Sequence, residues 1–147
     1  MKDNLYLRDV APDDLAVFFE HQRDPAATEM AQFPPRDRAS FTAHWTKILA
    51  DGSTVNRTIL VGDAVAGYIV CWQQDGERLV GYWVGREYWG QGVATRALAA
   101  FVVQVVARPL SAYVARSNVA SRRVLEKCGF VVVAADADEL VLRLGPD

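Results

Sequence analysis

The chain has 147 residues, about half of them apolar, and a formal net charge of −2. This length fits a single domain over residues 1–147, and the apolar fraction is sufficient for a buried core. The near-neutral charge favours neither nucleic acid nor an anionic membrane surface as a partner. No apolar run reaches the ~20 residues that cross a bilayer, and the first residues do not resemble a signal peptide. We therefore expect a cytoplasmic protein with reduced, buried thiols at Cys71 and Cys128.

The first third of the chain predicts one strand and two helices. Mixed alternation indicates a strand over residues 5–10, and a proline followed by two acids opens a helix over residues 13–22. Three prolines make residues 24–39 a loop with at most one short helical turn. Ser40 is the expected N-cap of the second helix, which ends at Asp51.

Three strands are expected next, over residues 58–61, 65–72 and 79–84. Tight turns at residues 62–63 and 75–76 separate them, because Gly-Asp and Asp-Gly pairs favour the hairpin turns that join neighbouring strands. This part of the sequence therefore predicts an antiparallel meander.

The pattern then changes to strand, loop, helix and strand. A loop over residues 85–92 leads into a helix over 93–107, which Pro109 ends, and a strand follows over 110–115. Such a unit makes the strands on either side of the helix parallel, with a right-handed crossover. A short helix capped by Asn118 and a final hairpin, over residues 130–134 and 140–144, complete an α/β fold with a mixed sheet.

The loop over residues 87–95 is the first candidate for a binding site. The first amides of a helix lack internal partners, and together with the helix dipole they favour a phosphate. Gly90, Gly92 and Ala94 keep the surface flat, so an anion can approach the backbone. The loop is neither a P-loop nor a dinucleotide fingerprint, since Thr95 replaces the third glycine. A tight strand–helix turn without a ligand stays open as the alternative.

Residues 84–127 carry seven basic and two acidic side chains, a charge of +5, which leaves −7 on the remainder. A basic segment on an acidic protein suits a small anionic ligand. Chance clustering of solvated charges would give the same pattern.

A second segment adds a specific pattern. Asn118 and Ser121 lie three residues apart and share one side of a helix, although capping alone would explain Asn118. With the loop, this segment resembles the GNAT acetyltransferase superfamily, and most closely its ribosomal-protein N-terminal acetyltransferase branch. In the loop pattern Gln/Arg-x-x-Gly-x-Gly/Ala, Gly92 and Ala94 match and Trp89 replaces the first residue. The second pattern, Asn-x-x-Ser followed by Glu-Lys-x-Gly-Phe, matches at Asn118, Ser121, Glu126, Lys127, Gly129 and Phe130.

The resemblance implies a GNAT fold with acetyl-CoA as the cofactor and no metal. In the family, the amides of residues 91–95 hold the pyrophosphate, and the strand end at Trp83 and Val84 pairs with the pantetheine arm between two splayed strands. Asn118 bonds to the arm from the other side. The implied cofactor-binding residues are Trp83, Val84, Trp89, Gly90, Gln91, Gly92, Val93, Ala94, Thr95, Asn118 and Ser121.

The implied reaction is direct attack of a primary amine on the thioester. The tyrosine that usually protonates the leaving sulfur is replaced by Leu125, so Ser121 becomes the catalytic candidate, and a backbone N–H near Val84 is expected to bind the oxyanion. Tyr82 and Tyr113 are within possible reach of this centre. No single general base stands out among Glu20, His21, Glu29, Glu77 and Glu87.

The acceptor is expected in a cleft formed by the helices within residues 13–50 and the strands facing them. A protein N-terminus and a small-molecule amine both fit, and the acidic remainder of the chain favours a cationic acceptor. Two other functions stay open: a non-catalytic acetyl-CoA sensor, which Leu125 favours, and a nucleotide-binding protein that uses the same loop. The protein is expected to be a monomer or a homodimer.

Overall fold

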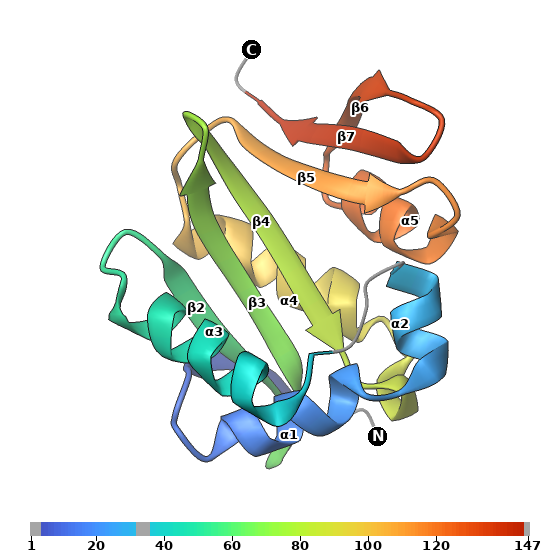
Figure 1. Cartoon of the computed structure of the whole chain (residues 1–147). Helices are drawn as coiled ribbons and strands as arrows, with labels where there is room; N and C mark the ends of the chain where they lie inside the picture. The colour runs from blue at the N-terminus through green and yellow to red at the C-terminus, as the bar shows by residue number, and fades with distance from the viewer. Residues whose placement is uncertain (1–3, 32–35, 146–147) are drawn as a thin grey trace.

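The computed structural model describes residues 4–31 and 36–145. One seven-stranded sheet, in the order β1-β2-β3-β4-β5-β7-β6, forms its centre (Figure 1). The strands are β1 (Leu5–Asp9), β2 (Val55–Val61), β3 (Ala64–Gln74), β4 (Glu77–Val84), β5 (Leu110–Ala115), β6 (Val131–Ala135) and β7 (Glu139–Leu144). The helices are α1 (Asp14–Gln22), α2 (Pro25–Ala31), α3 (Arg38–Ala50), α4 (Val93–Gln104) and α5 (Val119–Lys127), with a 3-10 turn, η1 (Arg86–Tyr88).

The predicted fold class is confirmed. Strands β1 to β4 form an antiparallel meander, β4 and β5 are parallel, and β6 and β7 form the final hairpin. Strand β7 returns between β5 and β6, so it pairs with both. Within residues 4–31 and 36–145, no helix is long and apolar enough to cross a membrane.

Helices cover both faces of the sheet, with α1 and α3 on one face and α4 and α5 on the other, and a separate core lies on each face (Figure 1). On the α4 and α5 face, the buried side chains are mainly aliphatic and include Leu98, Phe101 and Leu125, all at 0% exposure. On the α1 and α3 face the core is aromatic. The rings of Trp45 on α3 and Tyr68 on β3 meet edge to face, with 4.8 Å between their centroids. Two members of this core, Trp45 and Tyr68, also line the larger of the two cavities described below.

Two predictions about the first third of the chain are corrected. Residues 25–31 form helix α2, which is longer than the single turn expected, because proline is tolerated at a first helical position. Asp24 stabilises this start, since its carboxylate accepts a hydrogen bond from the Ala26 N–H at 2.9 Å. Residues 32–35 of the same predicted loop lie outside the described residues. Helix α3 is capped by Asp37, not Ser40, and the Asp37 carboxylate accepts from the Ser40 N–H at 2.8 Å.

Helix α4 ends at Gln104, three residues before the predicted end. The guanidinium of Arg108 folds back and donates to backbone carbonyls of the last turn, including Val102 and Val105 at 3.0 and 2.7 Å. It thereby supplies donors to carbonyls that a helix end leaves without partners. Both cysteines are free; Cys71 is buried as predicted, whereas Cys128 is only half-buried, contrary to the prediction.

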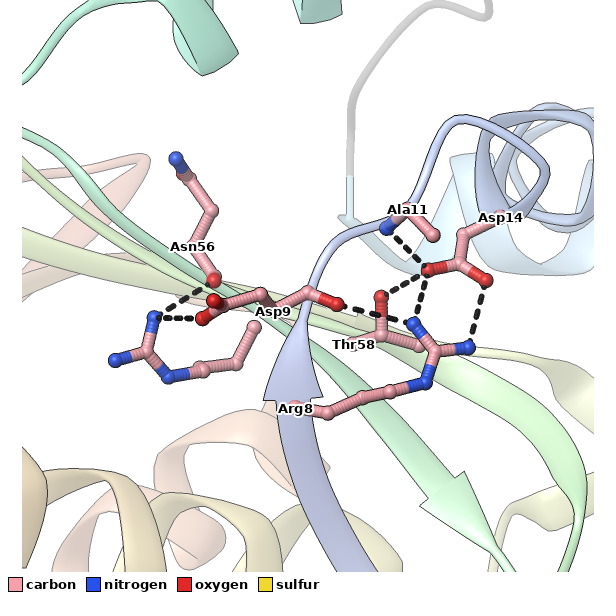
Figure 2. A network of polar contacts seen from close by, with 7 residues as sticks. Arg8, Asp9, Ala11, Asp14, Asn56 and Thr58 are labelled. Atoms are coloured by element: carbon pink, nitrogen blue, oxygen red, sulfur yellow. Dashed lines mark hydrogen bonds and ion pairs between the residues drawn. The ribbon is translucent and has the colours of Figure 1, made fainter.

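A buried carboxylate ties β1, α1 and β2 together (Figure 2). Asp14, only 3% exposed, accepts from both terminal nitrogens of Arg8 at 2.7 and 2.9 Å, from Thr58 Oγ1 at 2.6 Å and from the Ala11 N–H at 2.8 Å. Burial alone would raise the pKa of Asp14, but the hydrogen bonds outweigh burial and lower it. The network fixes the first turn of α1 against the sheet.

We predict that Asp14→Asn lowers the free energy of unfolding by about 1–3 kcal/mol, because an amide cannot accept all four hydrogen bonds. Urea denaturation measures this loss. Since the folded-state pKa lies below the ordinary 3.8, the contribution is present at neutral pH and disappears as the pH falls through the folded-state value. The difference in the free energy of unfolding between the parent and Asp14→Asn should therefore become smaller in acid.

Asp9→Asn is the matched control. Asp9 pairs with Arg57 at 3.2 Å in the same region, but its side chain is 91% exposed. Exposed ion pairs contribute little, so this variant should unfold like the parent. Equal losses in both variants would contradict the role assigned to Asp14.

Candidate functional site

The sheet opens between its two parallel strands. β4 and β5 are paired at a single position, Leu79 with Ser111, and they diverge from there toward the carboxyl end of β4 (Figure 1). Ligands of α/β folds bind beyond the carboxyl ends of parallel strands. The gap is therefore a candidate ligand-binding site.

The end of β4 presents backbone groups to this gap. Val84 is opposite Gly67 of β3, and the Gly85 N–H donates to the Ala66 carbonyl at 2.8 Å. In an antiparallel ladder this arrangement turns the N–H and C=O of Val84 away from β3. Trp89 Nε1 then donates to the Val84 carbonyl at 3.0 Å, which leaves the Val84 N–H directed into the gap. Hydrogen-bonding direction alternates along the strand, so the backbone N–H and C=O of the neighbouring Trp83 point toward β3.

The loop after β4 is shaped by two left-handed residues. Gly90 and Gly92 both have φ of +75°, which non-glycine residues rarely adopt. A Cβ at either position would meet no atom within 4 Å, so the loop surface is open. Gly92 is the N-cap of α4, and it makes no side-chain capping hydrogen bond there. The first amides of α4 thus keep the anion-binding potential predicted from the sequence.

A cavity of about 440 Å³ lies beside this loop. It is bounded by the end of β4, the start of α4 and one side of α5. All of the predicted cofactor-binding residues line it except Gln91, whose side chain turns back to donate to the Glu87 carbonyl at 2.9 Å. The predicted residues that line it are Trp83, Val84, Trp89, Gly90, Gly92, Val93, Ala94, Thr95, Asn118 and Ser121.

The basic segment contributes less to this cavity than its charge suggests. Only two of its seven basic residues, Arg123 and Lys127 on α5, line the cavity. Others have structural roles: Arg86 pairs with Asp24 at 3.5 Å, and Arg116 donates to the Asp136 carbonyl at 2.7 Å. These two cations add positive charge to the same cavity that the start of α4 lines.

A larger cavity, of about 1100 Å³, lies on the other side of the gap. Residues of α3, β3, β4 and β5 line it, including the aromatic pair Trp45 and Tyr68. Both cavities are lined by the same four residues at their junction: Tyr82, Trp83, Asn118 and Ser121. A molecule in one cavity can therefore reach a molecule in the other across the open part of the sheet.

The junction holds a pair of hydroxyl groups. Tyr82 on β4 and Ser121 on α5 lie 2.7 Å apart, oxygen to oxygen, and Tyr82 also donates to the Ser121 carbonyl at 3.3 Å. Asn118 caps α5, with its side-chain oxygen accepting from the Ser121 N–H at 3.2 Å. Leu125 is fully buried in the core, so this position offers no polar group to the junction.

The predicted general bases mostly lie elsewhere. Glu77 lines the larger cavity, where Tyr113 donates to it at 2.8 Å. His21 packs under Gly85, so closely that a Cβ there would lie 2.6 Å from its Nε2, but it lines neither cavity. The others, Glu20, Glu29 and Glu87, are exposed and also line neither cavity.

Sequence reasoning missed His44. It projects from α3 into the larger cavity, and no motif marks it. Burial lowers the pKa of its imidazole, and the nearby charges of Arg36 and Lys47 lower it further. A neutral imidazole in this cavity can accept a proton at neutral pH.

Comparison with known proteins assigns the family. The family model described as "Acetyltransferase (GNAT) domain" matches residues 4–131. The chain belongs to the GNAT acetyltransferase family. This confirms the resemblance at the level of the family, whereas the ribosomal-protein branch remains a prediction. No curated protein sequence matches the chain.

Solved structures share the GNAT fold. An acetyltransferase from Agrobacterium tumefaciens is 22% identical, covers 99% of this chain and 93% of its own, and has a TM-score of 0.81. A GNAT-family acetyltransferase from Bacillus anthracis is 17% identical over 98% and 96%, also with a TM-score of 0.81. AAC(6')-Ib, solved with ribostamycin and coenzyme A, is 17% identical over 97% and 93%, with a TM-score of 0.82. At these identities the similarity concerns the fold.

We predict that His44 of this GNAT domain titrates below the ordinary 6.5, because protonation adds charge to a half-buried ring beside two cations. An NMR titration of the imidazole measures this pKa. Lys47→Gln should raise the value toward 6.5, since it removes one of the two charges. A parent value at or above 6.5 would contradict the electrostatics described for this cavity.

Proposed function

We propose that this protein is an N-acetyltransferase that moves the acetyl group of acetyl-CoA to a primary amine by direct attack. The observation that carries this proposal is the junction of two cavities at an opening in the sheet. One cavity has helix amides and two cations, which suit a phosphate-bearing donor. The other approaches the same four residues from the opposite face, where an acceptor would enter.

The residues of the smaller cavity fit coenzyme A. Its pyrophosphate suits the open glycine surface at Gly90 and Gly92 and the first amides of α4. Arg123 and Lys127 offer charge to the phosphates, and the edge of β4 at Val84 offers backbone groups to the amides of the pantetheine arm. Trp83 would contact the arm through its side chain, since its backbone is engaged with β3.

The chain's own residues supply positioning and hydrogen bonds. Acetyl-CoA contributes an acetyl thioester; the amine nitrogen bonds to the carbonyl carbon as the carbon–sulfur bond breaks, the amine loses one proton and the sulfur gains one. The Val84 N–H points into the gap, where it can donate to the developing oxyanion. The Ser121 hydroxyl lies at the junction, where it can donate to the leaving sulfur. Among the side chains that line the larger cavity, His44 is the one suited to accept the proton that the amine loses, because its lowered pKa keeps the imidazole neutral.

The larger cavity supports a cationic acceptor, either a small-molecule amine or a protein N-terminus. Four carboxylates line it against the cations Arg36 and Lys47, with His44 held neutral. An excess of negative charge attracts positively charged ligands and raises their local concentration. The lining carboxylates are those of Asp51, Asp75, Glu77 and Glu139.

A non-catalytic acetyl-CoA sensor is the second candidate, because Leu125 occupies the position of the usual proton donor. Turnover separates the two functions. An enzyme releases free CoA when an amine is supplied, whereas a sensor binds acetyl-CoA and releases none with any amine.

The first experiment is a calorimetric titration of the parent and of Gly92→Glu with acetyl-CoA. We expect micromolar binding to the parent and a loss of at least about tenfold in the variant, since a carboxylate would face the phosphates. Gly62→Glu is the matched control: its φ of +60° is also left-handed and its surroundings are open, but it lies in the turn between β2 and β3. Absence of binding to the parent would refute the proposed function.

A second experiment tests the two lining cations. Arg123→Ala combined with Lys127→Ala should weaken acetyl-CoA binding about tenfold at low salt, because two charges near the phosphates are removed. The difference from the parent should shrink as salt is added. Arg122→Ala is the control, since Arg122 is on the same helix but pairs with Glu126 at 3.3 Å and lines neither cavity. Equal effects from both variants would indicate a general charge effect.

A further inference from the structure

The contact between Tyr82 and Ser121 links β4 to α5, the helix that follows β5, at the junction of the cavities. Tyr82 comes from β4, and Ser121 from the first turn of the helix that follows β5. Their oxygens are 2.7 Å apart, a short hydroxyl–hydroxyl hydrogen bond. Both residues line both cavities, so a ligand on either side meets this pair.

The direction of this hydrogen bond follows from the acidity of the two groups. The single Tyr82 proton has two acceptors within reach, Ser121 Oγ at 2.7 Å and the Ser121 carbonyl at 3.3 Å. We assign it to Ser121 Oγ, because that contact is much the shorter of the two and because a phenol is a stronger acid than an aliphatic alcohol. Burial raises the pKa of Tyr82 to about 12, although the hydrogen bond with Ser121 opposes this shift. Tyr82 therefore remains protonated throughout the neutral range and remains a donor.

Donation from Tyr82 decides where the Ser121 proton points. Once Ser121 Oγ accepts from Tyr82, its own O–H must turn away from the phenol, and the space around it is the cavity junction. The short bond also polarises the serine hydroxyl, which strengthens the donor. A serine hydroxyl without such a partner would lose rotational entropy each time it bonded to a ligand. The Ser121 hydroxyl is already oriented before the ligand binds.

We propose that Tyr82 is a positioning residue that aims the Ser121 hydroxyl at the leaving sulfur, a role that rests on the proposed acetyltransferase function. As the carbon–sulfur bond breaks, the sulfur keeps the electron pair and accepts a hydrogen bond from Ser121. Tyr82 keeps its proton throughout. The thiolate afterwards takes a proton from solvent, which balances the proton that the amine has released.

Other groups near the junction are engaged in different contacts. The Sγ of Cys128 faces the Thr95 carbonyl at 3.5 Å, and the Tyr113 hydroxyl donates to Glu77. Leu125 is apolar and buried. Tyr82 and Ser121 thus form the hydroxyl pair best placed to act on the sulfur.

The test is a double-mutant cycle of Tyr82→Phe and Ser121→Ala, with kcat and KM measured by release of CoA. We expect each single variant to lower kcat about tenfold, since each removes one oriented hydrogen bond from the transition state. The double variant should be no slower than Ser121→Ala, because Tyr82 acts only through Ser121. The KM and the calorimetric Kd for acetyl-CoA should stay within about twofold of the parent.

Tyr6→Phe is the matched control. Tyr6 is an exposed tyrosine of β1 whose hydroxyl accepts from Asn4 at 3.1 Å, remote from both cavities. Its kcat should equal that of the parent. A second variant, Ser121→Thr, retains the hydroxyl and should keep both turnover and its dependence on Tyr82.

Three outcomes would overturn the inference. These are an unchanged kcat in Tyr82→Phe, a double variant whose losses multiply, and a loss confined to acetyl-CoA binding. If Tyr82→Phe does not fold, Ser121→Ala still tests the inference. Full turnover in Ser121→Ala would show that the Ser121 hydroxyl is not needed, and Tyr82 could then have no role in orienting it. Failure of the proposed function is distinct, because the parent itself would then release no CoA with any amine.

Discussion

β4 and β5 pair at a single position in the sheet, Leu79 with Ser111. Because the strands separate beyond it, the last residues of β4 have an edge that no strand covers. Backbone groups at an uncovered edge need partners, and a ligand with amides along its length can supply them. The same separation lets two cavities on opposite faces meet at Tyr82 and Ser121. The opening of the sheet therefore connects two cavities on opposite faces, which is the arrangement that the proposed transfer between donor and acceptor requires.

The end of β4 must be rigid for this opening to be useful. Trp89 folds back onto the Val84 carbonyl, and Gly85 lies so close to His21 that no side chain fits between them. The two left-handed glycines then turn the chain into α4. The two cavities also differ in charge: cations and helix amides line the smaller one, while carboxylates predominate in the larger one. A phosphate-bearing donor and a cationic acceptor would thus be sorted to opposite faces of the same gap.

The sequence predicted the parts of this protein that local chemistry determines. Turn pairs, Pro109 and the cap at Asn118 marked the element boundaries well enough to predict the mixed sheet, and the glycine loop marked the smaller cavity. It could not predict that Arg108 ends α4 early or that Asp37 caps α3 instead of Ser40. In each case several nearby side chains could satisfy the helix end, and only the folded structure shows which one does. The sequence named Tyr82 and Ser121 as separate candidates, but it could not predict their contact or the position of His44, since these arise from elements that only the folded chain brings together.

The Leu125 position shows why fold and chemistry are separable in this protein. α5 must bury one side against the α4 face, and an apolar residue there contributes core packing that a tyrosine pointing at the cavity would not. Placing leucine there strengthens the core but removes a hydroxyl from the helix. The strand supplies one instead, because Tyr82 reaches across the gap to the first turn of α5. A donor pair shared between two elements works only while β4 and α5 stay at hydrogen-bonding distance, so the chemistry proposed here depends on how the two halves of the fold are packed together.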